Sequence, residues 1–140
     1  MYEEADLFLD AQDSVWSAVV LELSTGKKTS HWMWFVFPQL ASLGQSHMSQ
    51  LYGLHDLTEA QEYLSDPTLR SRLEEVAGLM LLHRDRSAKS ILGAVDARKL
   101  QSCMTLFSKV AGSPTIFADV LDMFYAGQPC QATLTEIDAG

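Results

Sequence analysis

The sequence predicts an all-α fold: a compact single domain of about seven helices with an aromatic-rich segment at its core. Apolar residues recur at helical spacing through most of the chain, and cap, proline and glycine signals stand where helices would begin and end. We find no convincing run of alternating strands. The 140 residues fit one domain, and no repeat or linker divides residues 1–140.

The first predicted helix runs from Asp6 to Thr25, with Gly26 as its stop signal. After a polar stretch comes the aromatic segment, residues 31–39 (His-Trp-Met-Trp-Phe-Val-Phe-Pro-Gln), which holds two of the three tryptophans. Both alternating sets of its side chains are apolar, so the pattern does not separate a buried strand from a buried helical turn. Such a segment either anchors the core or lines a pocket with a polar mouth.

The middle of the chain predicts three helices. The first lies within residues 40–51 and is broken or capped near Gly44. Capping-box spacing predicts the second at about residues 57–65. The third spans residues 66–83, because an aspartate cap is followed by proline at the first helical position.

The last part of the chain predicts three more helices and a final turn. A serine cap and a glycine stop bound a short helix at residues 87–92, and Asp96 caps a helix that ends at Gly112. A Ser-Pro pair opens a helix over residues 113–127. Residues 133–137 form one further turn.

Charge and composition limit the classes of partner. The net charge of −8 repels phosphate backbones, so we expect neither nucleic-acid nor membrane binding. No apolar run approaches the ~20 residues of a membrane span, and the acidic N-terminus lacks the basic region of a signal peptide, so a cytoplasmic location is expected. The basic pairs at 27–28 and 98–99 suit a small anionic ligand. The sequence names no protein partner.

Common catalytic and metal-binding signatures are absent from the sequence. It contains no Walker phosphate loop, no GxGxxG, no GxSxG and no HExxH motif, and its four histidines lack metal-ligand spacing. We therefore expect no metal and no cofactor. Cys103 lies on an apolar helix face, which favours a core thiol over a nucleophile.

A polar stripe on the predicted helix 96–112 supplies the first candidate binding residues. Asp96, Lys99 and Ser102 are spaced by three residues and share one face, and Thr105 extends the stripe by another turn. A lysine beside two hydroxyl groups is suited to hold an anionic group. The alternative is a solvated helix face.

The aromatic segment supplies the second set of candidates. Lys28 brings a positive charge before the segment, and Gln39 brings an amide at its end. Trp32 and Trp34 either stack on a planar ligand or pack in the core. We expect Trp34 in the core and Trp32, beside polar His31, in a pocket. His31 is the best candidate for a general acid or base, because an ordinary imidazole titrates near working pH; the alternative is a structural histidine.

Four strings in the chain resemble a known bacterial family: GKKTSHWMWFVFPQL, LGQS, DLTEAQEYLSDPTLRSRL and ILGAVDARKLQSCMTLF. The family is domain of unknown function 1810, some members of which are labelled "calpastatin", and the likeness runs from about residue 7 to residue 134. The resemblance implies a compact all-α single domain and brings no activity with it. Cys103 stands where a second serine is common in the family. The calpastatin label receives no support, because calpastatins resemble disordered repeats and a 47% hydrophobic chain is typical of a globule.

Two hypotheses about function follow. In the first, the aromatic segment and the helix 96–112 face each other across a pocket for a small anionic, nucleotide-derived ligand, and hydrolysis of a glycosidic or phosphate-type bond is the first reaction to assay. In the second, the protein is a non-catalytic protein-interaction module. The pocket requires His31 and Lys99 to converge on one concavity, whereas the interaction module predicts a flat apolar patch.

Overall fold

Helices build the fold of residues 2–139, the part of the chain that the computed structural model describes; Met1 and Gly140 lie outside it. Within that part there are ten α-helices, one 3₁₀ helix and no strand beyond a single bridge between Leu40 and Leu54. The elements are α1 (Ala5–Asp13), α2 (Trp16–Thr25), α3 (Met33–Val36), η1 (Ala41–Leu43), α4 (His47–Tyr52), α5 (Leu57–Ser65), α6 (Pro67–Leu81), α7 (Ala88–Leu92), α8 (Ala94–Ser108), α9 (Ile116–Tyr125) and α10 (Gln131–Ala139).

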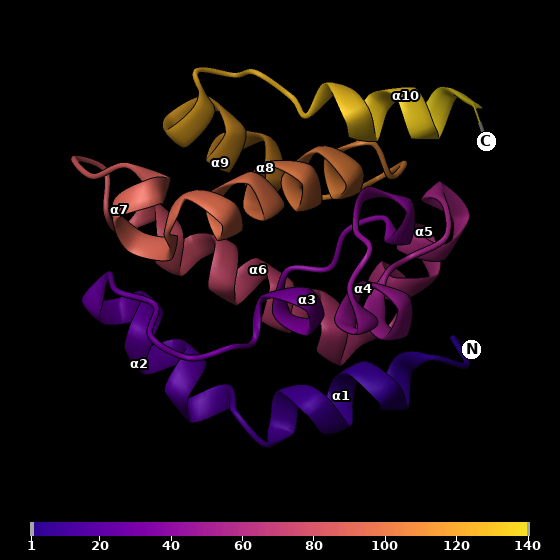
Figure 1. The fold of residues 1–140 in the computed structure, drawn as a ribbon, viewed down its shortest axis with the longest axis horizontal. Helices are drawn as coiled ribbons and strands as arrows, with labels where there is room; N and C mark the ends of the chain where they lie inside the picture. Colours follow the sequence, from indigo (N-terminus) through magenta and orange to yellow (C-terminus); the bar gives the residue numbers. More distant parts are fainter. Residues whose placement is uncertain (1, 140) are drawn as a thin grey trace.

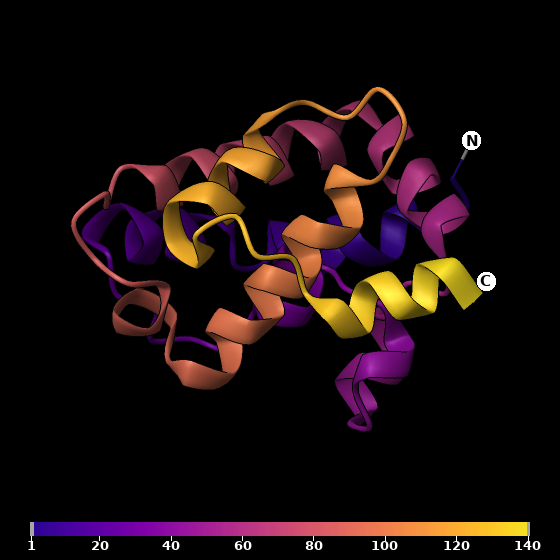
Figure 2. The same cartoon turned by 90° about the horizontal axis from the view of Figure 1, so that it is seen from above.

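The arrangement places α6 and α8 at the centre (Figure 1). Helix α8 contacts α5, α7, α9 and α10, while α6 contacts α1, α2, α5 and α9. Turned by 90°, the structure shows η1 and α4 projecting from one side of the molecule, near α8 and α10 (Figure 2). The apolar faces of α6 and α8 are fully buried and form much of one continuous core, which confirms the all-α prediction.

The structure has more helices than the seven predicted, in part because the predicted first helix is two separate helices, α1 and α2. It breaks between Asp13 and Trp16, where the Ser14 hydroxyl donates to the carbonyl of Ala11 at 2.8 Å. A serine that bonds its own backbone competes with helix continuation. The helix predicted within residues 40–51 is likewise divided into η1 and α4.

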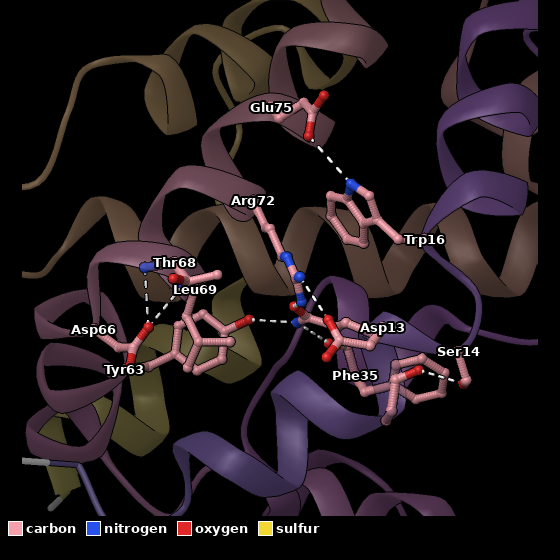
Figure 3. Close-up of polar contacts among 12 residues, drawn as sticks. Asp13, Ser14, Trp16, Phe35, Tyr63, Asp66, Thr68, Leu69, Arg72 and Glu75 are labelled. Carbon is pink, nitrogen blue, oxygen red and sulfur yellow. Dashed lines mark hydrogen bonds and ion pairs between the residues drawn. The ribbon is translucent and has the colours of Figure 1, made fainter.

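Several predicted caps are present, and others are not. Asp66 accepts from the backbone N–H groups of Thr68 and Leu69 at 3.0 Å each, with proline in the first turn (Figure 3). Ser87 also caps its helix as predicted. Asp96, by contrast, is not a cap: α8 begins earlier, at Ala94. This leaves its carboxylate free for other partners.

The later boundaries also differ from the prediction. Helix α8 ends at Ser108 rather than at residue 112, and α9 begins at Ile116, after the Ser-Pro pair. The single turn predicted at residues 133–137 is the full helix α10.

The aromatic segment is a single helical turn, α3, and residues 32–37 are all buried. A polar network holds it in place. The side-chain amide nitrogen of Gln12 donates to the carbonyl of Phe35 at 2.7 Å and to the Tyr63 hydroxyl at 3.1 Å. Arg72 donates to Gln12 at 3.3 Å and to Asp13 at 2.6 Å (Figure 3). The turn is thereby tied to α1, α5 and α6.

None of the helices that the structure describes is both long enough and apolar enough to span a membrane.

Candidate functional site

A buried carboxylate on α2 organises the loop that leads into the aromatic segment. Glu22 accepts from the backbone N–H groups of Thr29 and Ser30 at 2.8 and 2.9 Å. It also accepts from the Ser30 hydroxyl at 2.7 Å and from the indole N–H of Trp32 at 3.1 Å. Four donors from Thr29, Ser30 and Trp32 thus converge on one side chain.

These donors decide the charge state of Glu22. Burial by itself raises the pKa of a carboxyl group, but the hydrogen bonds from Ser30, Thr29 and Trp32 favour the ionised form more strongly and lower the pKa of Glu22 to about 2. The carboxylate is therefore ionised at neutral pH. It fixes the loop on which Lys28 and His31 stand.

A triad of ion-paired side chains connects this loop to α8, in which Asp96 pairs with both Lys28 and Lys99. The Nζ atom of Lys28 lies 2.8 Å from one carboxylate oxygen of Asp96, and Nζ of Lys99 lies 3.3 Å from the other. Each ammonium group also lies over an indole ring, Lys28 at 5.0 Å from the centroid of Trp32 and Lys99 at 5.2 Å from that of Trp34. The two lysines are therefore fixed both by a shared carboxylate and by aromatic faces.

Two adjoining cavities surround this triad. The small cavity has a volume of about 170 Å³, and the large cavity has a volume of about 590 Å³. Trp34 and Lys99 line both, so they form the boundary between the two. The small cavity is completed by Lys28, His31, Trp32, Met33, Met48 and Asp96. The large one is completed by Gln39, Leu43, Gly44, Gln45, Ser46, Val95, Arg98, Ser102, Cys130 and Ala132.

The ring of Trp34 lies directly against the backbone at Gly44. A Cβ atom on Gly44 would lie 2.8 Å from Cη2 of Trp34 and 2.8 Å from Cβ of Ser49. These distances are too short for real contacts, so only glycine allows the ring to occupy this position. Gly44 thereby determines where the indole face meets the cavities.

The structure brings most of the predicted site residues together. His31 and Lys99 line the same small cavity, with Lys28 and Asp96 beside them. Gln39 lines the large cavity. The aromatic segment and the polar stripe of α8 therefore meet at one concave site.

The expected division between the two tryptophans does not hold, because both side chains are buried and both border the small cavity. Trp32 is only 1% exposed, belongs to the core and donates to Glu22, although one face borders the small cavity. Trp34 is 9% exposed and borders both cavities. Glu22 accounts for the position of Trp32, because its carboxylate accepts the hydrogen bond from the indole N–H and holds the ring inside the core.

Two predicted hydroxyl ligands hold the C-terminal part of the chain instead. Ser102 borders the large cavity, but its hydroxyl is paired with that of buried Thr133 at 2.8 Å. Thr105 is fully buried and lines neither cavity; it accepts from the backbone N–H of Cys130 at 2.9 Å and donates to the carbonyl of Gln101 at 2.8 Å. The structure thus places Thr105 away from both cavities, contrary to the role expected for it, because the segment entering α10 covers it.

Sequence reasoning missed Glu22 as a site residue and noted Arg98 only as part of a basic pair. One feature of the sequence could have identified Glu22: its carboxylate stands next to Leu23 on the apolar side of a predicted helix. Arg98 lines the large cavity. Cys103 is fully buried, and burial raises the pKa of its thiol well above the ordinary value, which confirms a core thiol. The described residues contain no group of three or more side chains placed to hold a metal ion.

Comparison with known proteins gives two matches. Residues 3–137 match a protein family described as "Protein of unknown function (DUF1810)". The conserved hypothetical protein Rv1873 from Mycobacterium tuberculosis, solved by crystallography, is 40% identical; the match covers 96% of each chain with a TM-score of 0.94. No curated protein matches the chain.

Proposed function

The chain belongs to the DUF1810 family of proteins of unknown function, and from its site we propose that the two adjoining cavities bind a small anionic metabolite that carries a planar, nucleotide-derived group. The observation that carries this proposal is the position of Lys99. Its ammonium group lies 5.2 Å from the centre of the Trp34 ring, and both residues border both cavities. One short stretch of surface thus offers a flat stacking face and a positive charge.

The local charge supports an anionic ligand. The protein as a whole carries a net charge of −8. The two cavities nevertheless are lined by Lys28, Arg98 and Lys99 against the single carboxylate of Asp96. A local excess of positive charge on an acidic protein attracts an anion to this place rather than to the surface in general.

The dimensions of the cavities support a ligand with two parts. The small cavity of about 170 Å³ lies below the ~300–1,000 Å³ that is usual for small-molecule sites, so it suits an anionic group better than a whole nucleoside. The large cavity of about 590 Å³ lies within the ordinary range for small-molecule sites. We therefore place the anionic group in the small cavity and the planar group in the large one, against Trp34.

A hydrolytic activity is the second part of the proposal. His31 is exposed, lines the small cavity beside Lys99 and Asp96, and is not engaged through its ring by any hydrogen bond among the described residues. An imidazole in that position is suited to act as general acid or base on a glycosidic or phosphate-type bond. The anionic group next to it would then lie at the reacting centre.

Fewer observations favour a protein-interaction module. The large apolar side chains that are exposed in the described part of the chain are Leu21, Leu51, Leu82 and Val95. They are spread over α2, α4, the end of α6 and α8, and Val95 borders the large cavity. The concave site therefore explains more of the structure than a flat apolar patch does.

Ligand titrations test the proposed binding. Thermal unfolding is recorded with a panel of anionic aromatic metabolites, and each hit is titrated by calorimetry. A ligand at about 100 times its Kd stabilises the protein by about 2.7 kcal/mol, which shifts Tm by several degrees. Lys99→Ala is expected to weaken binding at least tenfold. Lys109→Ala is the matched control, since this lysine is exposed just past the opposite end of α8.

The same titrations show which part of the proposal fails. If no anionic aromatic compound stabilises the wild type, or if both lysine variants bind alike, the binding proposal is wrong. Hits are then incubated with wild type and with His31→Asn, and products are followed by chromatography. Binding without turnover by the wild type rejects the hydrolytic part alone.

A further inference from the structure

We propose that Asp96 determines the charge of the ligand, so that the site prefers a planar compound with a singly charged anionic group over one that ends in a doubly charged phosphomonoester. The singly charged group is an oxyanion such as a phosphodiester or a carboxylate. This inference rests on the proposed function and names its ligand class more narrowly.

The triad leaves one unit of positive charge in the small cavity. Lys28 and Lys99 contribute two cations, and Asp96 contributes one anion, with His31 counted as neutral. A singly charged group balances this charge. A doubly charged group exceeds it and must also approach the Asp96 carboxylate, which repels it.

The two lysines are not equivalent in this arrangement. The side chain of Lys28 is 8% exposed and makes the shorter contact with Asp96, 2.8 Å, so its charge is largely committed to that partner. The side chain of Lys99 is 23% exposed, lies at 3.3 Å from Asp96 and borders both cavities. Lys99 is therefore the cation that meets the ligand, while Lys28 holds Asp96 in place.

Asp96 is free to act in this way because of where α8 begins. The helix starts at Ala94, with Gly93 as its N-cap, so the Asp96 carboxylate does not cap the backbone. It is directed to the lysines and borders the small cavity. The loop that carries Lys28 is also held in place, since the backbone N–H of Lys28 donates to the carbonyl of Ile91 at 2.8 Å.

Three adenosine compounds that differ in charge test the inference. They are adenosine 5′-monophosphate, its singly charged methyl ester, and adenosine-5′-carboxylic acid, titrated at about pH 8, where a phosphomonoester carries close to two charges. Binding is measured by calorimetry. The wild type is expected to bind the two singly charged compounds about tenfold more tightly than the monophosphate, a difference of about 1.4 kcal/mol.

Charge-changing variants then shift this preference in opposite directions. Asp96→Asn removes the repelling charge and should reverse the order, with the monophosphate bound most tightly. Lys28→Gln removes a cation and should widen the wild-type preference further. Asp119→Asn is the matched control, since this aspartate is exposed on α9 and lines neither cavity. It should bind like the wild type.

Each outcome of these titrations either supports or overturns the inference. An unchanged order in Asp96→Asn overturns the inference while leaving the proposed function intact. Circular dichroism shows whether that variant folds; if it does not, Lys28→Gln decides alone, and an unchanged ratio in it overturns the inference. If only the methyl ester binds tightly, the inference stands and the group is a phosphodiester. Failure of all three compounds to bind the wild type at millimolar concentration overturns both this inference and the proposed function.

Discussion

The carboxylate of Glu22 on α2 accepts a hydrogen bond from the indole N–H of Trp32 at 3.1 Å, across the loop that joins α2 to α3. This contact joins the core to the site. It holds the buried indole over which Lys28 lies at 5.0 Å, and Lys28 in turn pairs with Asp96. Stability and site geometry therefore depend on the same buried carboxylate.

Glu22 is expected to make stability fall in acid. The pKa of its carboxyl group is about 2 in the folded protein, against 4.5 when it is unperturbed, so the unfolded chain takes up the proton first. The stabilisation is fully present above about pH 4.5 and is lost as the pH falls toward 2; it amounts to about 3 kcal/mol. Urea melts over this range compare the wild type with Glu22→Gln.

The difference between those two proteins isolates the contribution of Glu22, because other carboxylates contribute equally to both. Glu22→Gln should be less stable than the wild type at neutral pH, and the gap should close as the pH falls. Glu62→Gln, on the exposed side of α5, is the control and should follow the wild type at every pH. Parallel curves for wild type and Glu22→Gln would contradict the assignment.

The two tryptophans are expected to contribute differently to stability. Trp32 is 1% exposed and belongs to the core, so Trp32→Ala should cost about 3–5 kcal/mol. Trp34 borders two cavities, and water can fill part of the space that Trp34→Ala leaves, so the loss should be smaller by about 1 kcal/mol or more. Trp34→Ala should instead weaken ligand binding. Urea melts of both variants measure the difference, and equal losses would mean that the cavities beside Trp34 do not reduce the cost of truncating it.

The sequence predicted the parts of the fold that depend on local chemistry. The helix caps at Asp66 and Ser87 could be predicted from the sequence, because each capping oxygen accepts a hydrogen bond from a backbone N–H only two or three residues further along the chain. The break between α1 and α2 was missed because apolar spacing continues through it. That break depends on a local bond from Ser14 to Ala11, which hydrophobic periodicity does not reveal.

The candidate site was predictable only as two segments. Lys28 and Asp96 were predicted as binding residues on separate segments, and the fold brings their charged groups to 2.8 Å from each other. The roles of Trp32 and Thr105 were not predictable, because each depends on a partner distant in sequence. Glu22 approaches the first from α2, and the backbone of Cys130 covers the second.

Gly44→Ala is expected to displace the Trp34 ring. The added Cβ would meet Cη2 of Trp34 and Cβ of Ser49 at 2.8 Å each, so the ring must shift, at a cost of about 1–3 kcal/mol. Ligand binding and the tryptophan emission spectrum, to which Trp34 contributes, should change together. The double variant Gly44→Ala/Trp34→Phe has a smaller ring at the contact and should lose less stability than the two single changes combined.

Gly78→Ala is the matched control for this substitution. A Cβ at Gly78 would meet only Cδ1 of Ile116, at an ordinary 3.7 Å, within helix α6. Alanine is the better helix former by about 1 kcal/mol, so the control should be as stable as the wild type or more so. If Gly44→Ala behaves in the same way, the close packing of Trp34 on the backbone is not a constraint.

The hydroxyl pair of Ser102 and Thr133 is expected to hold α10 against α8. Thr133 is the buried residue of α10, and the two hydroxyl groups are 2.8 Å apart. Ser102→Ala or Thr133→Val alone leaves a buried hydroxyl without its partner and should cost about 1–3 kcal/mol. The double variant removes both polar groups, so it should cost much less than the two single changes combined.

Urea melts give the coupling energy, and hydrogen exchange at the amides of α10 shows whether each single variant loosens this helix. Since Ala132 of α10 borders the large cavity, a loosened helix should also weaken ligand binding. Additive losses, with unchanged exchange in α10, would mean that other contacts hold this wall of the site.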